Sequence, residues 1–341
     1  MYKTVKLKNF LILTAAVCVL LISLLFFRGF FHGSIAASAE TEDFIHWVDF
    51  DVPVEVLKAA AELDIETHET GPHLGWVDSV AYLAAEYYGD FSRYRSSDLA
   101  ALAEAVAGGE TVEALAKDLA YFDYYREAYG AVLGGFIGEY EQDGERKYGL
   151  KAYSPIAAAF PYNDYDDFGV SRSYGFQRQH LGHDMMAAVG TPVVAVESGT
   201  VEAMGWNQYG GWRIGIRSFD GKRYHYYAHL RQNRPYAEGL EVGDTVMAGE
   251  VIGYVGRTGY STKENVNNIQ VNHLHYGLQL VFDETQKEAL SEIWIDVYDL
   301  CRLLESHRSS VQRNDETKEW TAEDPIRETV PEDRFVPSPS P

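Results

Sequence analysis

The sequence predicts a multi-domain chain: an N-terminal membrane-anchor helix, a small all-α domain, a mainly antiparallel β-sheet domain and a disordered C-terminal tail. A charge-free apolar run lies near the amino terminus, apolar residues then recur at three- and four-residue spacing, and short β-rich runs separated by glycines follow. The length of 341 residues also exceeds one typical domain of about 100–200 residues. We expect the boundaries at 1–40, 41–150, 151–300 and 301–341.

Composition limits the classes of partner. The chain is 46% hydrophobic and 23% charged, which is typical of globular proteins and excludes a wholly disordered or collagen-like chain. Asp and Glu number 51 against 29 Lys and Arg, for a net charge of −22. Nucleic acid is an unsuitable partner for so acidic a chain, because binding it takes a basic surface. Two cysteines, Cys18 and Cys301, are too few for a disulfide scaffold.

The amino terminus is predicted to insert into a membrane. Residues 10–27 carry no charge, and Lys3, Lys6 and Lys8 precede them. By the positive-inside bias, the amino terminus is cytoplasmic and the rest of the chain extracytoplasmic. The run just reaches the span of a bilayer, yet residues 37–39 (Ala-Ser-Ala) fit a signal cleavage site. Two alternatives stay open: a single-pass membrane protein, or a secreted one cleaved after Ala39.

Residues 41–150 are predicted to form a compact bundle of four or five helices. Apolar residues recur at helical spacing in 54–63 and 76–88, and Gly89 ends the second run. Gly108 and Gly109 end a further short helix. The region carries no motif typical of catalysis. Its aromatic residues are expected in a packed core, and its surface is a candidate docking site for a protein partner.

The chain changes character after residue 150. Runs such as TPVVAV, WRIGIRS and HLHYGLQLVF alternate with glycine turns across 151–300, which favours an antiparallel sheet. Residues 301–341 have few apolar anchors and end in VPSPSP, so we expect a disordered tail there.

The first chemical motif is an H-x-G-x-D arrangement from His180 to Asp184. Imidazole nitrogen and carboxylate oxygen are suitable zinc ligands, and Gly182 would let the backbone fold tightly enough for both to reach one ion. Taken alone, such a pair is more often a solvated surface pair.

Two further histidine-rich runs supply more candidates. Within HLH, strand alternation would project His273 and His275 from one face, while Leu274 and Tyr276 project into a core. The run from Tyr224 to Leu230 contains His225 and His229. If this run is also a strand, His225 and His229 share a face, and one of them near a metal could carry protons, since histidine titrates close to neutrality. We expect His225 to be structural.

The combined motifs resemble the lysostaphin-type zinc endopeptidases that cut peptidoglycan peptides. H-x-G-x-D, GTPVxAxxSGxV, YxHL, VGDxVxAGxxIG, GxTG and HLH occur in this order over about 120 residues. The resemblance covers about residues 153–299 and implies a lysostaphin-like fold there. It does not extend to the helical region. Biotin and lipoate carriers share the glycine-punctuated half-motifs, but the chain lacks their hairpin lysine, and the histidines would be unexplained.

The resemblance also implies roles for individual residues. One Zn²⁺ per chain would be held by His180, Asp184 and His275, leaving a fourth position for water, as in catalytic zinc sites. His273 would act as general base of that water and His229 as its hydrogen-bonding partner. Tyr174 would stabilise the oxyanion.

The implied function is a membrane-anchored zinc metalloendopeptidase that hydrolyses stem-peptide or cross-bridge bonds of cell-wall peptidoglycan. The alternative is a zinc-binding but catalytically silent scaffold or activator of another wall hydrolase. One departure from the pattern lies at 260–272, where a longer segment than usual precedes HLH. We expect it to reshape the substrate groove.

Overall fold

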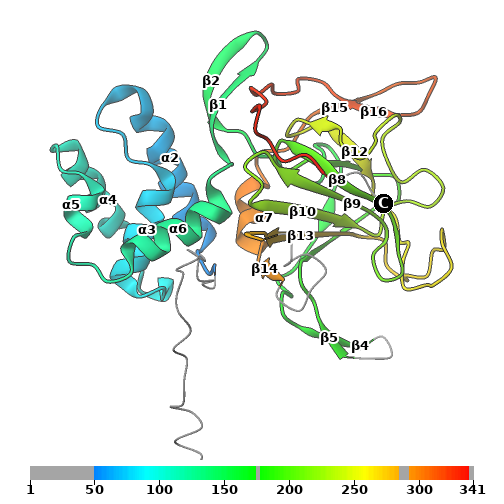
Figure 1. Cartoon of the computed structure of the whole chain (residues 1–341), viewed down its shortest axis with the longest axis horizontal. Helices are drawn as coiled ribbons and strands as arrows, with labels where there is room; N and C mark the ends of the chain where they lie inside the picture. Colours follow the sequence, from blue (N-terminus) through cyan, green and yellow to red (C-terminus); the bar gives the residue numbers. More distant parts are fainter. Residues whose placement is uncertain (1–49, 174–176, 284–291, 338–341) are drawn as a thin grey trace, which may run out of the picture. The chain divides into compact units, whose positions relative to one another are not determined.

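The computed structural model describes residues 50–173, 177–283 and 292–337 (Figure 1). The predicted anchor, the cleavage site after Ala39 and Tyr174 lie outside these residues. Among the residues it describes, none of the helices combines the length and apolarity that crossing a bilayer requires.

The region after Phe50 is helical, as the apolar spacing predicts. Thr111 caps one of its helices, its hydroxyl accepting a hydrogen bond from the backbone N–H of Ala114 at 3.2 Å. The five α-helices described between residues 54 and 133 agree with the predicted four or five. They are α2 (Val54–Thr70), α3 (Trp76–Tyr87), α4 (Ser96–Ala107), α5 (Val112–Ala116) and α6 (Phe122–Leu133), with a 3₁₀ turn at Phe91–Arg93.

The end of the expected helical region is instead a β-hairpin. Strands β1 (Ile137–Gln142) and β2 (Glu145–Leu150) pair antiparallel around Asp143 and Gly144. Both turn residues have positive φ, 56° and 76°, which is typical of a tight hairpin turn. An all-α assignment up to residue 150 is therefore wrong for this hairpin.

An antiparallel sheet dominates the rest of the chain, as predicted. Its strand order is β11-β8-β9-β10-β13-β6-β3, and β14 pairs with β13 beside this path. The strands are β3 (Tyr162–Asn163), β6 (His183–Ala187), β8 (Gly199–Asn207), β9 (Gly211–Ser218), β10 (Arg223–Ala228), β11 (Thr245–Val246), β13 (Leu274–Leu280) and β14 (Ile293–Ile295). Separate pairs are β4 (Ser171–Ser173) with β5 (Gln177–Gln179), and β7 (Pro192–Val194) with β12 (Val251–Tyr254).

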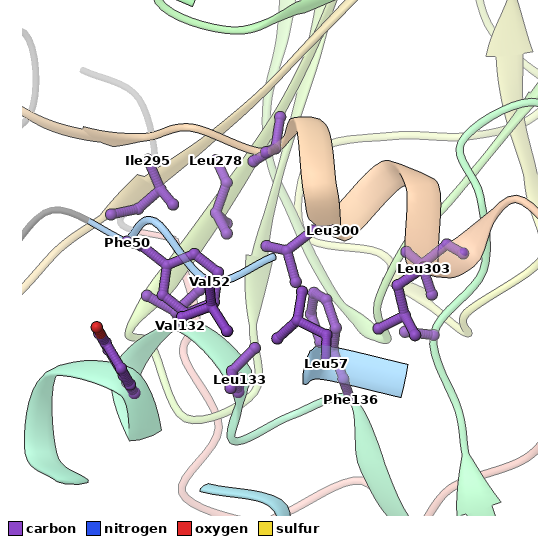
Figure 2. Packing of buried hydrophobic residues seen from close by; sticks show 14 of the residues in the cluster. Phe50, Val52, Leu57, Val132, Leu133, Phe136, Leu278, Ile295, Leu300 and Leu303 are labelled. Atoms are coloured by element: carbon purple, nitrogen blue, oxygen red, sulfur yellow. The ribbon is translucent and has the colours of Figure 1, made fainter. Parts of the chain in front are cut away.

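The sheet has one face in the core and one face that carries the polar site. On β13, Leu274, Tyr276 and Leu278 are buried on the core side, as strand alternation predicts. The helical region shares this core. Figure 2 shows Leu57 of α2 and Leu133 of α6 in one cluster with Leu278 and with Leu300 of helix α7 (Tyr298–Leu304).

A buried ion pair also joins the helices to the sheet. Arg223 of β10 donates from Nε and Nη2 to the two carboxylate oxygens of Glu197, at 2.8 and 2.9 Å. Its Nη1 donates to the carbonyl of Ala131 in α6 at 2.8 Å. Burial raises the pKa of Glu197, but Arg223 and His225 outweigh this effect and hold that pKa at about 2.

The expected disordered tail is wrong for residues 301–337. This segment holds most of α7 and the strand pair β15 (Val311–Arg313) and β16 (Trp320–Ala322). Leu303, Leu304 and Ile326 supply buried apolar side chains. Polar contacts secure the part after α7: the Ser309 hydroxyl donates to the carbonyl of Gly249 at 2.8 Å, and Glu319 accepts from Tyr254. A composition poor in apolar residues concealed these contacts.

Candidate metal centre

Three side chains from separate parts of the chain converge at one point. Asp184 of β6 and His275 of β13 are directly opposite each other in the antiparallel ladder. His275 Nδ1 lies 2.8 Å from Asp184 Oδ1, and His180 Nε2 lies 3.0 Å from each of these two atoms. All three residues are buried. The predicted ligand set is therefore brought together.

The donor set fits a zinc ion. Tetrahedral zinc with bonds of about 2.0–2.1 Å places its ligand atoms about 3.3 Å apart, and the observed separations are only slightly shorter. Two imidazole nitrogens and one carboxylate oxygen are three ligands from the protein, the number typical of catalytic zinc sites.

Neighbouring groups orient the ligands. Nδ1 of His180 lies 3.2 Å from the carbonyl oxygen and 3.0 Å from Oδ1 of Asp167, which directs Nε2 into the centre. Arg172 of β4 donates from Nη1 to Asp184 Oδ2 at 2.6 Å, which leaves Oδ1 as the ligand atom. Burial raises the pKa of Asp184, but His180 and His275 outweigh it and hold this pKa far below its usual range.

Gly182 of the H-x-G-x-D motif makes room for a ligand. A Cβ at this position would lie 2.7 Å from both Nε2 and Cε1 of His275, closer than real Cβ contacts. The glycine is therefore needed for close approach of the backbone to the His275 ring, rather than only for a tight turn.

The two remaining histidines lie beside the ligands, and Nε2 of each ring has no hydrogen bond to any residue that the structure describes. His229 Nδ1 is 2.9 Å from the carbonyl of Thr258, and His273 Nδ1 is 2.8 Å from that of Val271. Because a carbonyl only accepts, each Nδ1 carries the proton and each Nε2 has a lone pair. The two ring centroids are 4.8 Å apart, and His273 Nε2 lies 3.6 Å from Asp184 Oδ2. Burial, followed by the nearby His273 and His275, lowers the pKa of His229 well below its usual value, which favours the neutral form.

His229 reaches this centre by a break in the strand. His225 faces the core, where its ring nitrogens contact Tyr276 Oη at 2.9 Å and Glu197 at 2.8 Å. Regular alternation would direct His229 to the same side. Strand β10 ends at Ala228, however, and His229 has a left-handed φ of 60°. This reversal brings its ring to within 5.8 Å of the His275 ring, so the expectation of a face shared with His225 is wrong.

Sequence reasoning missed several neighbours of the centre. Arg172 and Asp167 carry no motif, and only the folded hairpin brings them to the ligands. The position of Tyr226 could have been predicted, because strand alternation places it on the other face of the sheet from the core-facing His225. Its ring centroid lies 6.0 Å from that of His275. Tyr260, in the long segment before HLH, stacks at 5.9 Å from His229.

A groove of about 760 Å³ extends from the centre along the polar face of the sheet. His229 and His275 line one part of it, and Trp294, Phe335 and Pro337 line others. The C-terminal segment thus contributes to the groove wall.

Glycines keep the groove open. A Cβ at Gly215 would lie 1.9 Å from Tyr224 Oη, and one at Gly277 would lie 2.7 Å from the Trp294 ring. The aromatic rings therefore extend across neighbouring glycines instead of rising into the groove.

Sequence comparison identifies the part of the chain that holds this centre. Residues 178–288 match peptidase family M23. The chain contains a peptidase family M23 domain. The matched residues include all three candidate ligands together with His229 and His273, whereas Arg172 and the helical region lie outside them.

Two curated relatives share the region of the M23 domain, an L-Ala–D-Glu endopeptidase and lysostaphin. The chain is 36% identical over 155 residues to the L-Ala–D-Glu endopeptidase of Bacillus subtilis, which covers 46% of each chain. It is 40% identical over 98 residues to lysostaphin of Staphylococcus simulans, covering 28% of this chain and 17% of lysostaphin. The aligned parts thus span less than half the length of these relatives.

A solved structure extends the similarity beyond the M23 domain. The crystal structure of a protein proposed to be a glycyl-glycine endopeptidase, lytM, from Ruminococcus gnavus is 27% identical, with a TM-score of 0.51. The match covers 74% of this chain and 88% of that one.

Proposed function

We propose that this chain is a zinc metalloendopeptidase that hydrolyses peptide bonds of cell-wall peptidoglycan. The observation that carries the proposal is the convergence of ligand atoms of His180, Asp184 and His275 within 3.0 Å of one another, beside two histidines whose Nδ1 atoms are held by backbone carbonyls. The match of residues 178–288 to peptidase family M23 supports it, as do relatives named as endopeptidases.

The chemistry divides between the ion and the side chains. A zinc ion held by the three ligands would lower the pKa of water toward neutrality and polarise the substrate carbonyl. His229 and His273 are placed to accept the proton of the attacking water at Nε2 and to return it to the departing amine. Their backbone partners keep both rings in the tautomer that this task needs.

The scissile bond is proposed to lie in the stem peptide. The B. subtilis relative is named for cleavage between L-Ala and D-Glu, and it aligns with more of this chain than lysostaphin does. We further propose that residues 10–27 hold the enzyme at the outer face of a membrane, or that it is secreted after cleavage behind Ala39. The helical region is a proposed docking surface for a protein partner.

Purified full-length protein and isolated peptidoglycan test the proposal. With zinc present, we expect new amino groups to be released and muropeptide mass spectra to name the bond. Chelation of zinc, or the His275→Ala variant, should abolish the release. Zinc binding without hydrolysis of any wall preparation would overturn the enzyme in favour of a zinc-binding scaffold or activator.

A further inference from the structure

We propose that the GxTG motif, residues 256–259, and the long segment after it hold the ring of His229 in its working orientation. Thr258 and Asn265 are then positioning residues: they act through His229, and neither is among the described residues that line the groove. This inference rests on the proposed function, in which His229 transfers a proton, and it accounts for the GxTG motif.

His229 has a backbone conformation that its surroundings must support. Its φ of 60° lies in the left-handed region, which is uncommon for residues other than glycine. Such a residue persists only where neighbouring groups determine its conformation. Two hydrogen bonds do so here: the backbone N–H of His229 donates to the carbonyl of Gly210 at 2.7 Å, and Nδ1 donates to that of Thr258 at 2.9 Å. The position of the Thr258 carbonyl therefore sets the direction of the His229 ring.

The hydroxyl of Thr258 fixes the position of that carbonyl. It donates to the carbonyl of Leu230, the residue after His229, at 2.6 Å, and it accepts from the backbone N–H of Trp212 at 3.1 Å. Trp212 follows Gly210 by two residues and lies in β9. Thr258 is completely buried, so water cannot replace its hydroxyl. A single side chain thus joins the motif to both backbone segments that hold His229.

The two glycines of the motif permit this close approach. A Cβ at Gly256 would lie 2.5 Å from the backbone N and Cα of Arg231. A Cβ at Gly259 would lie 2.4 Å from the carbonyl oxygen of Tyr209 and 3.1 Å from Nδ1 of His229. All three named positions of GxTG therefore serve the contact between this segment and the backbone around His229.

Asn265 holds the long segment against the same backbone. Its Oδ1 accepts from Trp212 Nε1 and from the backbone N–H of Asn233, both at 2.9 Å, and its Nδ2 donates to Asn233 Oδ1 at 2.7 Å. Its backbone carbonyl accepts from Gln232 Nε2 at 2.6 Å. Trp212 is thus held through its backbone by Thr258 and through its indole by Asn265.

The long segment also contacts the His229 ring directly. Tyr260 stacks on this ring with the centroids 5.9 Å apart, and its backbone N–H donates to the carbonyl of Tyr209 at 3.2 Å. Among the residues that the structure describes, those that line the groove include none of 260–272. The contacts with His229 are therefore the direct route by which this segment can affect the reaction.

A pair of substitutions at Thr258 tests the proposal in the zinc-loaded full-length protein. Thr258→Val keeps the shape of the side chain and removes its hydroxyl, whereas Thr258→Ser keeps the hydroxyl. Because a small misplacement of a reacting group can cost about 100-fold, Thr258→Val should lower kcat by about 10- to 100-fold with little change in KM. Thr258→Ser should restore most of kcat. Thr262→Val, at an exposed position of the long segment, should leave kcat unchanged.

A second pair tests the long segment. Asn265→Gly removes the side-chain hydrogen bonds, and glycine accepts the φ of 60° at this position without strain. We expect a smaller loss of kcat than in Thr258→Val, because Thr258 still holds the carbonyl. Asn267→Gly is the matched control, since Asn267 is exposed in the same segment and donates to the side chain of Gln232. It should leave kcat unchanged.

Ring ¹⁵N resonances measure the state of His229 without turnover. In the wild type, Nδ1 of His229 should carry the proton and Nε2 should not, because a carbonyl faces Nδ1. In Thr258→Val, the tautomer with the proton on Nε2 should appear. Zinc content and the tautomer of His273, whose Nδ1 faces the carbonyl of Val271, should stay unchanged.

The outcomes separate this inference from the proposed function. An unchanged His229 tautomer in Thr258→Val, or an equal loss of kcat in Thr258→Ser, would overturn the positioning role. Loss of zinc in Thr258→Val would show a general disruption of the centre and would also overturn it. A changed tautomer in Thr258→Val, with a wild type that hydrolyses no peptidoglycan, would support the positioning role and overturn the enzyme.

Discussion

His275 Nδ1 lies 2.8 Å from Asp184 Oδ1 because the two residues face each other across strands β13 and β6. The antiparallel register fixes both positions, so the ligand pair depends on the sheet itself rather than on a loop. His273, two residues earlier in the chain, projects to the same side but keeps its Nε2 3.6 Å from Asp184 Oδ2.

This difference between the two histidines predicts separate consequences for zinc and turnover. His275→Ala removes a ligand, so zinc content should fall from one per chain to nearly none. His273→Ala should keep zinc and lose about 10²–10⁴-fold in kcat, the usual contribution of a general base. Metal analysis and rates on the same preparations check this. Equal zinc loss in both variants would show that the roles are not divided.

Arg172 is predicted to act as a positioning residue for Asp184. In Arg172→Met, Asp184 loses the donor on Oδ2 and its carboxylate can rotate, so zinc affinity should fall by about 10–100-fold. Competition with a calibrated chelator measures the affinity. Arg313→Met is the matched control, since Arg313 is exposed on β15. An unchanged zinc affinity in Arg172→Met would show that Arg172 does not position Asp184 and serves only to stabilise the hairpin of β4 and β5.

The buried pair of Glu197 and Arg223 is predicted to govern stability. Arg223→Met removes the bidentate partner of the buried Glu197 and leaves it with the single contact to His225, which should lower the free energy of unfolding by about 3–5 kcal/mol. In Arg126→Met, which breaks a surface pair with Glu113, the loss should stay below about 1 kcal/mol. Denaturant titration compares the two, and similar losses would contradict the buried pair's role.

Because of Glu197, the free energy of unfolding is predicted to fall at acidic pH. The folded-state pKa of Glu197 is lowered from 4.5 to about 2, so its contribution is fully present above pH 4.5 and is lost as pH falls toward 2. Glu197→Gln cannot titrate. The difference in unfolding free energy between the wild type and this variant should therefore shrink over that interval. A difference that stays constant down to pH 2 would argue against a depressed pKa.

Gly215 is predicted to control access to the groove. Gly215→Ala places a Cβ 1.9 Å from the present position of Tyr224 Oη, so the ring must move toward the groove. We expect a lower kcat/KM, mainly through KM, with zinc content unchanged. Gly221→Ala is the control for a glycine substitution near the same strands. No atom lies within 4 Å of the Cβ position at Gly221, so this variant adds only the local backbone strain of a φ of 74°. Comparable kcat/KM losses would exclude a specific effect of Tyr224.

Motifs and strand alternation predicted the parts of the fold and centre that depend on local pattern. The antiparallel sheet, the helices after Phe50 and the convergence of His180, Asp184 and His275 follow from such patterns. The position of His229 did not, because a single left-handed residue reverses the alternation. The role of Arg172 and the ordered structure of residues 301–337 could not be predicted either. Contacts between polar residues far apart in the sequence, such as Glu319 with Tyr254, leave no periodic signal.

Anomalous diffraction at the zinc edge, from crystals grown with zinc, tests the central claim most directly. The account predicts one peak per chain bonded to His180 Nε2, Asp184 Oδ1 and His275 Nδ1, with His229 and His273 close by but not bonded. A peak held by other residues, or zinc-bearing crystals without a peak at these three atoms, would contradict it.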